Sequence, residues 1–229
     1  MSKKWVHQRT LVSGLLGAAL VLVAQVANAG SLAGSKHDFS GVAAYGTGGQ
    51  VCIACHAPHN NQVAVPLWNH APTVATYTNY TSPTLEAGVT STVGPASRLC
   101  LSCHDGTIAI NNFGGAVGAP AFATGAALLG TNLSNDHPIG FLYATSFATD
   151  GALFAATNAV TIGTGGTKTK VGTIATNLLY GGNVECTSCH DVHNTFTVPT
   201  ATSGTGGVSN KLVKVTMNGS SLCIACHDK

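Results

Sequence analysis

The chain has 229 residues, of which only 8% are charged, with ten Lys and Arg residues against eight Asp and Glu. Three of the ten basic residues, Lys3, Lys4 and Arg9, lie at the N-terminus, which leaves the rest of the chain almost neutral. Nucleic acid binding depends on clusters of Lys and Arg that contact phosphates, and it is therefore excluded. One domain is the expectation for this length.

Residues 1–29 are predicted to be a secretory signal peptide. Their basic start is followed by an apolar stretch over residues 11–26 and by the small-x-small cleavage pattern Ala-Asn-Ala at 27–29. The alternative is a membrane anchor, but the apolar run is shorter than the roughly 20 residues that a spanning helix needs. Cleavage leaves residues 30–229 as one domain. No later stretch is apolar enough to span a membrane, so secretion with no transmembrane segment is expected.

All eight cysteines fall into four copies of one motif, Cys-x-x-Cys-His, read as CIACH, CLSCH, CTSCH and CIACH in chain order. This is the attachment motif of c-type haem, in which the two thiols add to the haem vinyl groups. The adjacent His then binds the iron as the proximal ligand. The sequence thus predicts four haem c groups. The thioether residues are Cys52, Cys55, Cys100, Cys103, Cys186, Cys189, Cys223 and Cys226, and the proximal ligands are His56, His104, His190 and His227.

Three other uses of paired cysteines explain the pattern less well. A disulfide scaffold needs no His at a fixed position, and structural zinc sites do not require four His at the same offset. A thioredoxin-like redox pair occurs once, on a βαβ pattern that the sequence lacks. No cysteine is left over for a disulfide, and export agrees with haem c because this haem is attached outside the cytoplasm.

Five further histidines after the signal peptide can supply the second axial ligand of each iron, which decides between a carrier and an enzyme. They are His37, His59, His70, His137 and His193. Both His59 and His193 follow a proximal His by three residues. Residues at i and i+3 share a helix face, so such a pair cannot lie on both sides of one iron. The second His should therefore reach a different haem.

The remaining candidates differ in their surroundings. His137 follows Asp136, whose carboxylate is positioned to orient the ring through its other nitrogen. His37 lies near the new chain end, which an iron bond would hold in place. The predicted distal set is His37, His59, His137 and His193, and His70, beside Trp68, is the reserve candidate and is expected to pack near a haem edge.

The segments between the motifs predict little regular structure. We expect mostly coil with short helices and a few short β-strands or hairpins, wrapped around four haems that supply much of the apolar interior. Short helices should begin at the motifs and end quickly, as Gly106 indicates. Residues 114–182 are rich in Gly, Ala and Thr, and β-branched residues flanking Gly-Gly near their end favour a small hairpin or an irregular loop. Disorder is the alternative for this segment.

The strings CIACHAPHN, PLWNH, LCLSCHDGTIA, NDHPIGF, VECTSCHDVHN and the terminal LCIACH resemble the OmcE-like tetrahaem c-type cytochromes, whose subunits polymerise into extracellular nanowires. The resemblance covers most of the chain after the signal peptide. It implies bis-His haems, with His59 reaching a neighbouring subunit and His37, His137 and His193 acting within their own. An assignment that uses His70 would change the role of His59.

The sequence therefore predicts an electron carrier and not an enzyme. The leading interpretation is the subunit of a head-to-tail extracellular or cell-surface filament, with identical subunits, redox proteins or extracellular acceptors as partners. The alternative is a monomeric periplasmic tetrahaem carrier. A multihaem reductase fits less well, because haem catalysis needs an open axial position and all four motifs keep their His.

Overall fold

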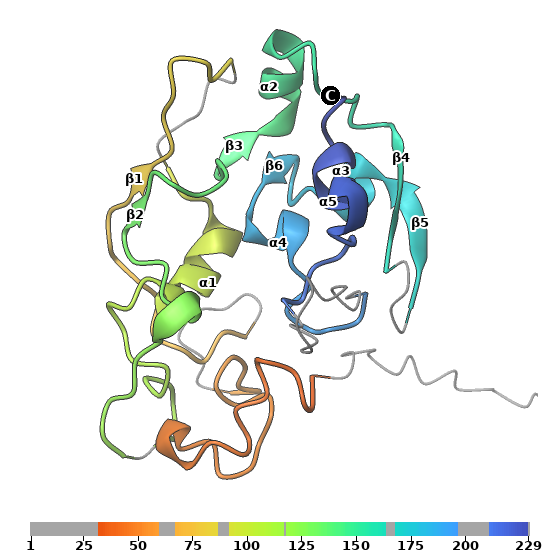
Figure 1. Ribbon diagram of the computed structural model, residues 1–229. Coiled ribbons are helices and arrows are strands. Elements are labelled where there is room, and N and C mark those ends of the chain that lie inside the picture. Colours follow the sequence, from red (N-terminus) through yellow and green to blue (C-terminus); the bar gives the residue numbers. More distant parts are fainter. Residues whose placement is uncertain are drawn as a thin grey trace, which may run out of the picture.

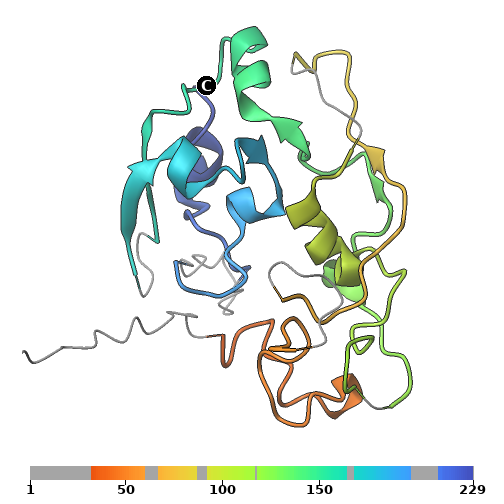
Figure 2. The same cartoon turned by 180° about the vertical axis from the view of Figure 1, so that it is seen from behind.

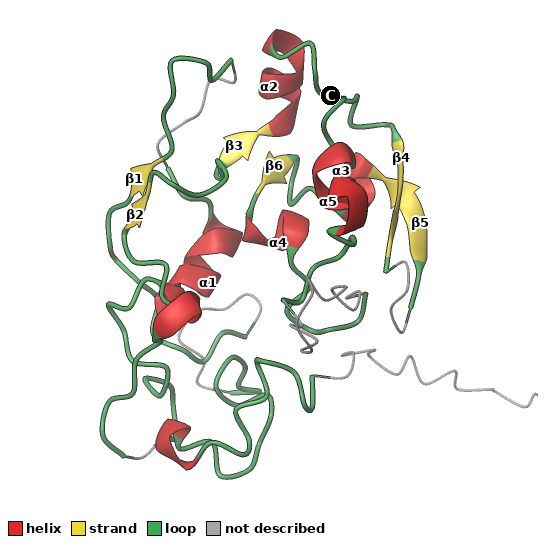
Figure 3. Ribbon diagram, in the orientation of Figure 1, coloured by secondary structure: helices red, strands yellow, loops and turns green. Residues whose placement is uncertain are grey.

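Coil is the main feature of the fold in this computed structural model (Figure 3). The structure describes residues 32–59, 67–86, 92–116, 118–163, 168–196 and 211–228. Short helices and short strands interrupt the coil, as the sequence predicts. The signal peptide predicted at 1–29 lies outside the described residues.

The helices and strands of the described segments are short, and the sheets have two strands each. The elements in chain order are η1 (Ala43–Tyr45), β1 (Thr78–Asn79), α1 (Pro95–His104), η2 (Gly125–Ala127), β2 (Asn132–Leu133), β3 (Phe141–Leu142), α2 (Tyr143–Thr149), β4 (Ala159–Ile162), β5 (Lys170–Thr173), α3 (Ile174–Asn177), β6 (Asn183–Val184), α4 (Cys186–Cys189), η3 (Asn218–Ser220) and α5 (Ser221–Ile224). Strand β1 pairs in parallel with β2, and β3 pairs antiparallel with β6.

The β4–β5 hairpin confirms the prediction of a hairpin in the Gly- and Thr-rich segment. Its four antiparallel pairs run from Ala159 opposite Thr173 to Ile162 opposite Lys170. Helix α3 packs against both strands, and α5 lies near it on the same side of the molecule (Figure 1). The larger core cluster gathers here, because the inward residues Val160, Ile162 and Ile174 are all buried. This hairpin and the helices beside it form the best packed part of the described chain.

Helices α1 and α4 carry the second and third Cys-x-x-Cys-His motifs and pack against each other, as Figures 1 and 2 show from opposite sides. Helix α1 begins at Pro95, one turn before the motif, because Gly94 is its extended N-cap and proline is favoured at the first helical position. It ends at His104, and Gly106 follows with φ +73°. The predicted stop at Gly106 is thus confirmed, but the start lies earlier than predicted.

The N-terminal part is held by polar contacts more than by apolar packing. The buried Asn69 side chain donates to the carbonyls of Ile53 (2.7 Å) and Gly114 (3.2 Å) and accepts from the Gly114 N–H (3.2 Å). Buried polar groups are stabilising only when hydrogen-bonded, and this amide meets that condition. The bonds join the loop of the first motif to two segments remote in the chain.

Among the helices of the described segments, none has both the length and the apolar character needed to cross a membrane.

Candidate functional site

Each Cys-x-x-Cys-His motif folds as a helical turn. In three of the motifs the N–H of His donates to the carbonyl of the first Cys, at 2.8 Å for His56, 3.0 Å for His190 and 3.0 Å for His227. In the second motif the turn belongs to α1, which ends at His104. Residues at i, i+3 and i+4 lie on one face of such a turn. Both thiols and the imidazole of each motif therefore face the same side, as covalent haem attachment requires.

All eight thiols are free. Cys52 and Cys223, the first cysteines of the first and fourth motifs, are exposed, and the other six are partly buried. None of the eight is paired in a disulfide in this structure. The thiols remain available for thioether bonds to a haem.

Thiols of successive motifs lie close enough to affect one another. Burial and, after it, neighbouring Cys55 raise the pKa of Cys103 to about 12. The Cys186 side chain, followed by burial, raises the pKa of Cys100. For Cys189, burial raises the pKa most, and Cys223 of the fourth motif adds to it. Motif one thus adjoins motif two, motif two adjoins motif three, and motif three adjoins motif four.

Three of the proximal histidines each face one of the predicted distal histidines. The ring centroids are 6.0 Å apart for His37 and His104, 6.0 Å for His56 and His193, and 6.3 Å for His137 and His227. A metal bound at about 2 Å from the nitrogen of each of two opposed imidazoles separates the ring centres by roughly 6 Å. The three pairs have the separation of bis-His haem ligands.

The angles between the paired rings also fit such ligation. The planes of His56 and His193 are 18° apart, and those of the other two pairs are 71° apart. Two rings that share one nitrogen–iron–nitrogen axis can take any angle about it. His193, which follows the third motif, faces the His of the first motif, so the i and i+3 histidines of motif three do not face each other.

Backbone carbonyls fix the orientation of several of these rings. Nδ1 of His104 lies 2.7 Å from the Ala127 carbonyl, and Nδ1 of His190 lies 2.8 Å from that of Lys211. A ring that donates its Nδ1–H in this way leaves Nε2 as the ligand atom. The prediction that Asp136 orients His137 is wrong: Nδ1 of His137 lies 2.8 Å from the Pro138 carbonyl. The nearest acceptor is the carbonyl of the next residue, so the carboxylate is not needed.

His37 is partly buried between two motifs. Its pKa is lowered to about 4, first by burial and then by repulsion from His104 and His190. The imidazole is therefore neutral at neutral pH, the form that binds a metal. The backbone around it is tied locally, with the His37 N–H donating to Ser35 Oγ at 3.2 Å.

His59 and His190 lack a partner ring in the described segments. Both are exposed, and neither takes part in a ring contact there. His190 already has its Nδ1 engaged by Lys211, so its Nε2 edge is the free one. Among the described residues, the third motif is thus the one whose His has no ring contact with a predicted distal His, although His37 lies close enough to be repelled by it.

The reserve candidate His70 has a backbone carbonyl close to each of its ring nitrogens. Nδ1 lies 2.9 Å from the Ala71 carbonyl, and Nε2 lies 2.9 Å from the Ala109 carbonyl. The side chain is 1% exposed and packs edge-on to Trp68 at 6.4 Å. Because both partners are carbonyl oxygens and a neutral imidazole has a single N–H, only one of these two contacts is a hydrogen bond in the neutral ring. Nε2 also lies 3.4 Å from Cys103 Sγ, and the near-complete burial of the side chain favours a packing role beside the second motif.

Two buried carboxylates beside the motifs escaped the sequence reasoning. Asp105, directly after the second motif, accepts from Thr73 Oγ1, Tyr77 Oη and Thr107 Oγ1, each at 2.7 Å. Burial acts to raise its pKa, but these donors outweigh burial and hold the pKa below its usual value. The Asp-Gly-Thr string is a turn signal that indicates the bond to Thr107. Glu185, directly before the third motif, is 2% exposed and gives no such signal.

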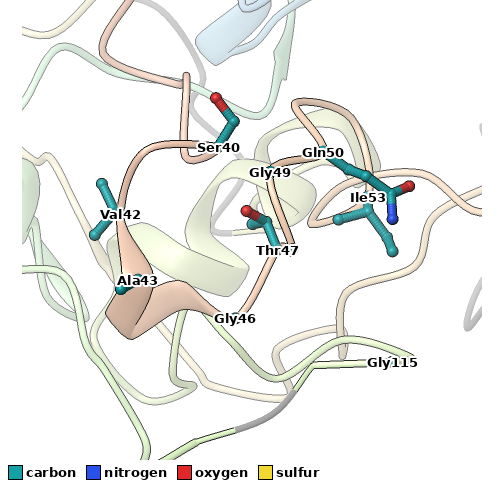
Figure 4. Close-up of a pocket in the computed structure, with 10 residues that line it drawn as sticks. Ser40, Val42, Ala43, Gly46, Thr47, Gly49, Gln50, Ile53 and Gly115 are labelled. Carbon is teal, nitrogen blue, oxygen red and sulfur yellow. The ribbon is translucent and has the colours of Figure 1, made fainter.

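The surfaces around the motifs have room and apolar character for a macrocycle. A hollow of about 440 Å³ lies beside Cys52 and His56 and is also lined by Leu67. A second hollow of about 430 Å³, shown in Figure 4, lies between the η1 turn and the loop up to Ile53 and is lined by no His, Cys or carboxylate. This second hollow is therefore lined by no side chain that could ligate a metal or attach a haem.

Large apolar side chains are exposed beside two motifs. Leu128 and Leu129 are 46% and 43% exposed, and they follow Ala127, whose carbonyl accepts the hydrogen bond from His104 Nδ1. Ile224, inside the fourth motif, is 47% exposed. Covering such surface with a porphyrin would remove it from water, which is favourable. The thiols, the paired imidazoles and these apolar surfaces together fit haem.

Within the described ranges, no group of three or more His, Cys, Asp and Glu side chains is placed to hold a metal ion by itself. A haem iron needs only two ligands from the protein, because the porphyrin supplies the other four. The comparisons add no family to this picture: no protein-family model and no curated protein matches the chain.

Proposed function

We propose that this protein is a secreted c-type cytochrome that holds four haems covalently and transfers electrons. The observation that carries the proposal is the set of three imidazole pairs with centroids 6.0 to 6.3 Å apart. Each pair joins the His of a Cys-x-x-Cys-His motif to a His from a distant part of the chain. In each pair, the motif His shares a helical turn with two free thiols, which is the arrangement that covalent, bis-His haem binding needs.

The chain's own groups would do the following. Each thiol would attach haem by adding across a vinyl group, with a C–S bond formed and the thiol hydrogen placed on the neighbouring vinyl carbon. The imidazoles would hold the iron, and at His104 and His190 the carbonyls at Nδ1 would leave Nε2 for that role and keep the ring in orientation. The bound haem supplies a one-electron ferric–ferrous couple. Two imidazoles on one iron leave no position for a substrate, so we propose electron transfer and no catalysis.

The contacts between motifs support an electron path in chain order. Cys55 adjoins Cys103, Cys100 adjoins Cys186, and the third motif adjoins the fourth. Haems attached at these thiols would follow one another as a row. Bis-His ligation favours potentials below those of His/Met haems, because Met raises the potential.

We further propose that the subunits assemble head to tail into an extracellular filament. His59 and His190 are both exposed, and among the described residues neither ring is in contact with another imidazole. His59 of one subunit can therefore complete the third iron of the next. Such a contact joins two different surfaces, and repeated without closure it builds an open helical assembly.

One observation favours a monomeric periplasmic carrier as the second candidate. His193 crosses from motif three to the His of motif one, and His59 occupies in motif one the position that His193 occupies in motif three. If the exchange were reciprocal, with His193 serving the iron of motif one and His59 serving that of motif three, His59 would complete the third iron of its own chain. All four irons would then be complete without a partner.

Carbon monoxide binding to the reduced protein separates the two candidates. In the filament, dissociated wild-type subunits should bind carbon monoxide at one haem in four, and assembled filaments should bind none. In the monomeric carrier neither form should bind it. His59→Ala should abolish filaments in electron micrographs in the first case. Normal filaments with four low-spin haems in that variant would refute the role of His59.

The proposal of a cytochrome has its own simpler test. The exported protein should show a Soret band, and its mass after denaturation should exceed that of the polypeptide by four haems. A colourless protein with the polypeptide mass would refute it.

A further inference from the structure

Glu185 is a buried carboxylate at the point where the second and third motifs meet. It is 2% exposed and directly precedes Cys186, as the extended N-cap of α4. Both the N–H (3.3 Å) and the hydroxyl of Ser97 donate to its Oε2. Ser97 itself is 0% exposed and lies on α1. The carboxylate is thus enclosed between the two helices that carry these motifs.

The surroundings are shaped around this side chain. A Cβ added to Gly94 would lie 1.6 Å from Glu185 Oε1, so only glycine leaves room for the carboxylate there. The Cys186 N–H donates to Ser97 Oγ at 3.0 Å, which closes the contact. Ser97 precedes Cys100 by three residues, about one helical turn. Glu185 therefore lies close to the attachment points of both haems.

In the part of the chain that the structure describes, no cation is paired with this carboxylate. Its donors there are neutral: the N–H and the hydroxyl of Ser97 and, in the capping box of α4, the backbone N–H of Ser188. A buried, uncompensated negative charge acts strongly on other charges nearby, because little water screens it. A ferric iron in a porphyrin dianion carries one net positive charge, and a ferrous iron carries none. The carboxylate therefore favours the ferric state.

We propose that Glu185 is a potential-setting residue that lowers the reduction potentials of the haems attached at motifs two and three. The step it affects is the gain of one electron by iron, from ferric to ferrous, with no bond made and no proton moved. The proposal rests on the proposed function, because it requires haem at these motifs. Its effect would be to hold electrons less tightly in the middle of the row, between the first and the fourth haem.

Glu185→Gln tests the charge without changing the shape. The amide oxygen can still accept from Ser97, so a merely structural contact predicts unchanged potentials. We expect a positive shift in one or two of the four midpoint potentials, measured by spectroelectrochemical titration of the exported holoprotein. The expected size is a tenfold or larger rise in the ferrous-to-ferric ratio at fixed potential, about 59 mV for one electron. Glu86→Gln, at an exposed acid, is the matched control and should shift nothing.

Ser97→Ala is an independent test that keeps the negative charge of Glu185. It removes the hydroxyl that stabilises the carboxylate, so the potentials should stay unchanged or become more negative even if the protein is less stable. A positive shift in Ser97→Ala would overturn the proposal, because it would trace the effect to packing. Unchanged potentials in a Glu185→Gln protein that retains four haems by mass would also overturn it. A wild-type protein without covalent haem would instead refute the proposed function.

Discussion

Replacing His193 with Ala tests the assignment of ligands most directly. This residue follows the third motif, yet its ring lies 6.0 Å from that of His56 in the first motif, centroid to centroid. The pairs of His37 with His104 and of His137 with His227 do not involve it. The variant should therefore keep all four haems, which the thiols hold, and open one iron, that of motif one.

The magnitude follows from the number of irons affected. One haem in four should change from low spin to high spin in the ferric protein and bind carbon monoxide in the ferrous protein, a quarter of the total haem signal. The assay is the carbon monoxide difference spectrum of the reduced variant, scaled to haem content by mass, with assembled wild-type protein as the reference. Because the thioether bonds are independent of the distal ligand, covalent haem content should not fall.

Two cysteine backgrounds identify which iron has opened. In the first, Cys52→Ala and Cys55→Ala remove the haem of motif one. In the second, Cys186→Ala and Cys189→Ala remove that of motif three. If His193 serves motif one, His193→Ala should add no carbon monoxide binding in the first background and should add one site in the second. The opposite pattern, or no binding in the single variant, would refute the pairing.

Two further predictions concern the scaffold. Tyr77→Phe removes the 2.7 Å bond from Tyr77 Oη to Asp105 and should lower the free energy of unfolding by about 1–2 kcal/mol in urea titrations. Burial raises the pKa of Tyr77 to about 12, above its value in the unfolded chain. The stability that the protonated Tyr77 contributes is therefore complete below pH 10 and is lost as the pH rises through 12. Between pH 10 and 12 the variant should lose less stability than the wild type, and an equal loss would contradict this account. Gly140→Ala should destabilise more than Gly130→Ala, since both have φ near +75° but only at Gly140 would a Cβ lie 2.4 Å from the Thr92 carbonyl oxygen. Equal melting temperatures for these two variants would refute the close approach.

Some of the fold could be predicted from the sequence because it depends on short-range rules. The pairing of β4 with β5 follows from β-branched residues on both sides of Gly-Gly. Gly106 stops α1 because its φ of +73° suits glycine and few other residues. The start of α1 was missed because Gly94 and Pro95 act as a cap outside the motif.

The kind of chemistry expected at the candidate site was determined by the sequence, since the residue types and their spacing within each motif are local features, whereas the tertiary structure adjusts the pKa values of those thiols and imidazoles. The four motifs, with eight thiols and five further histidines, were enough to predict four haems whose irons have few open axial positions. The argument from helix geometry that i and i+3 histidines serve different irons needed nothing more than their spacing.

The partners of those histidines were decided by the tertiary structure alone. His37 lies against His104, and His137 lies against His227. The segments between them are rich in Gly, Ala and Thr and show no hydrophobic periodicity from which the course of the backbone could be predicted. That path depends on long-range bonds such as those from Asn69 to Ile53 and Gly114. The meeting of Glu185 with Ser97 has the same origin, because two short helices far apart in the sequence come together only when the whole chain has packed.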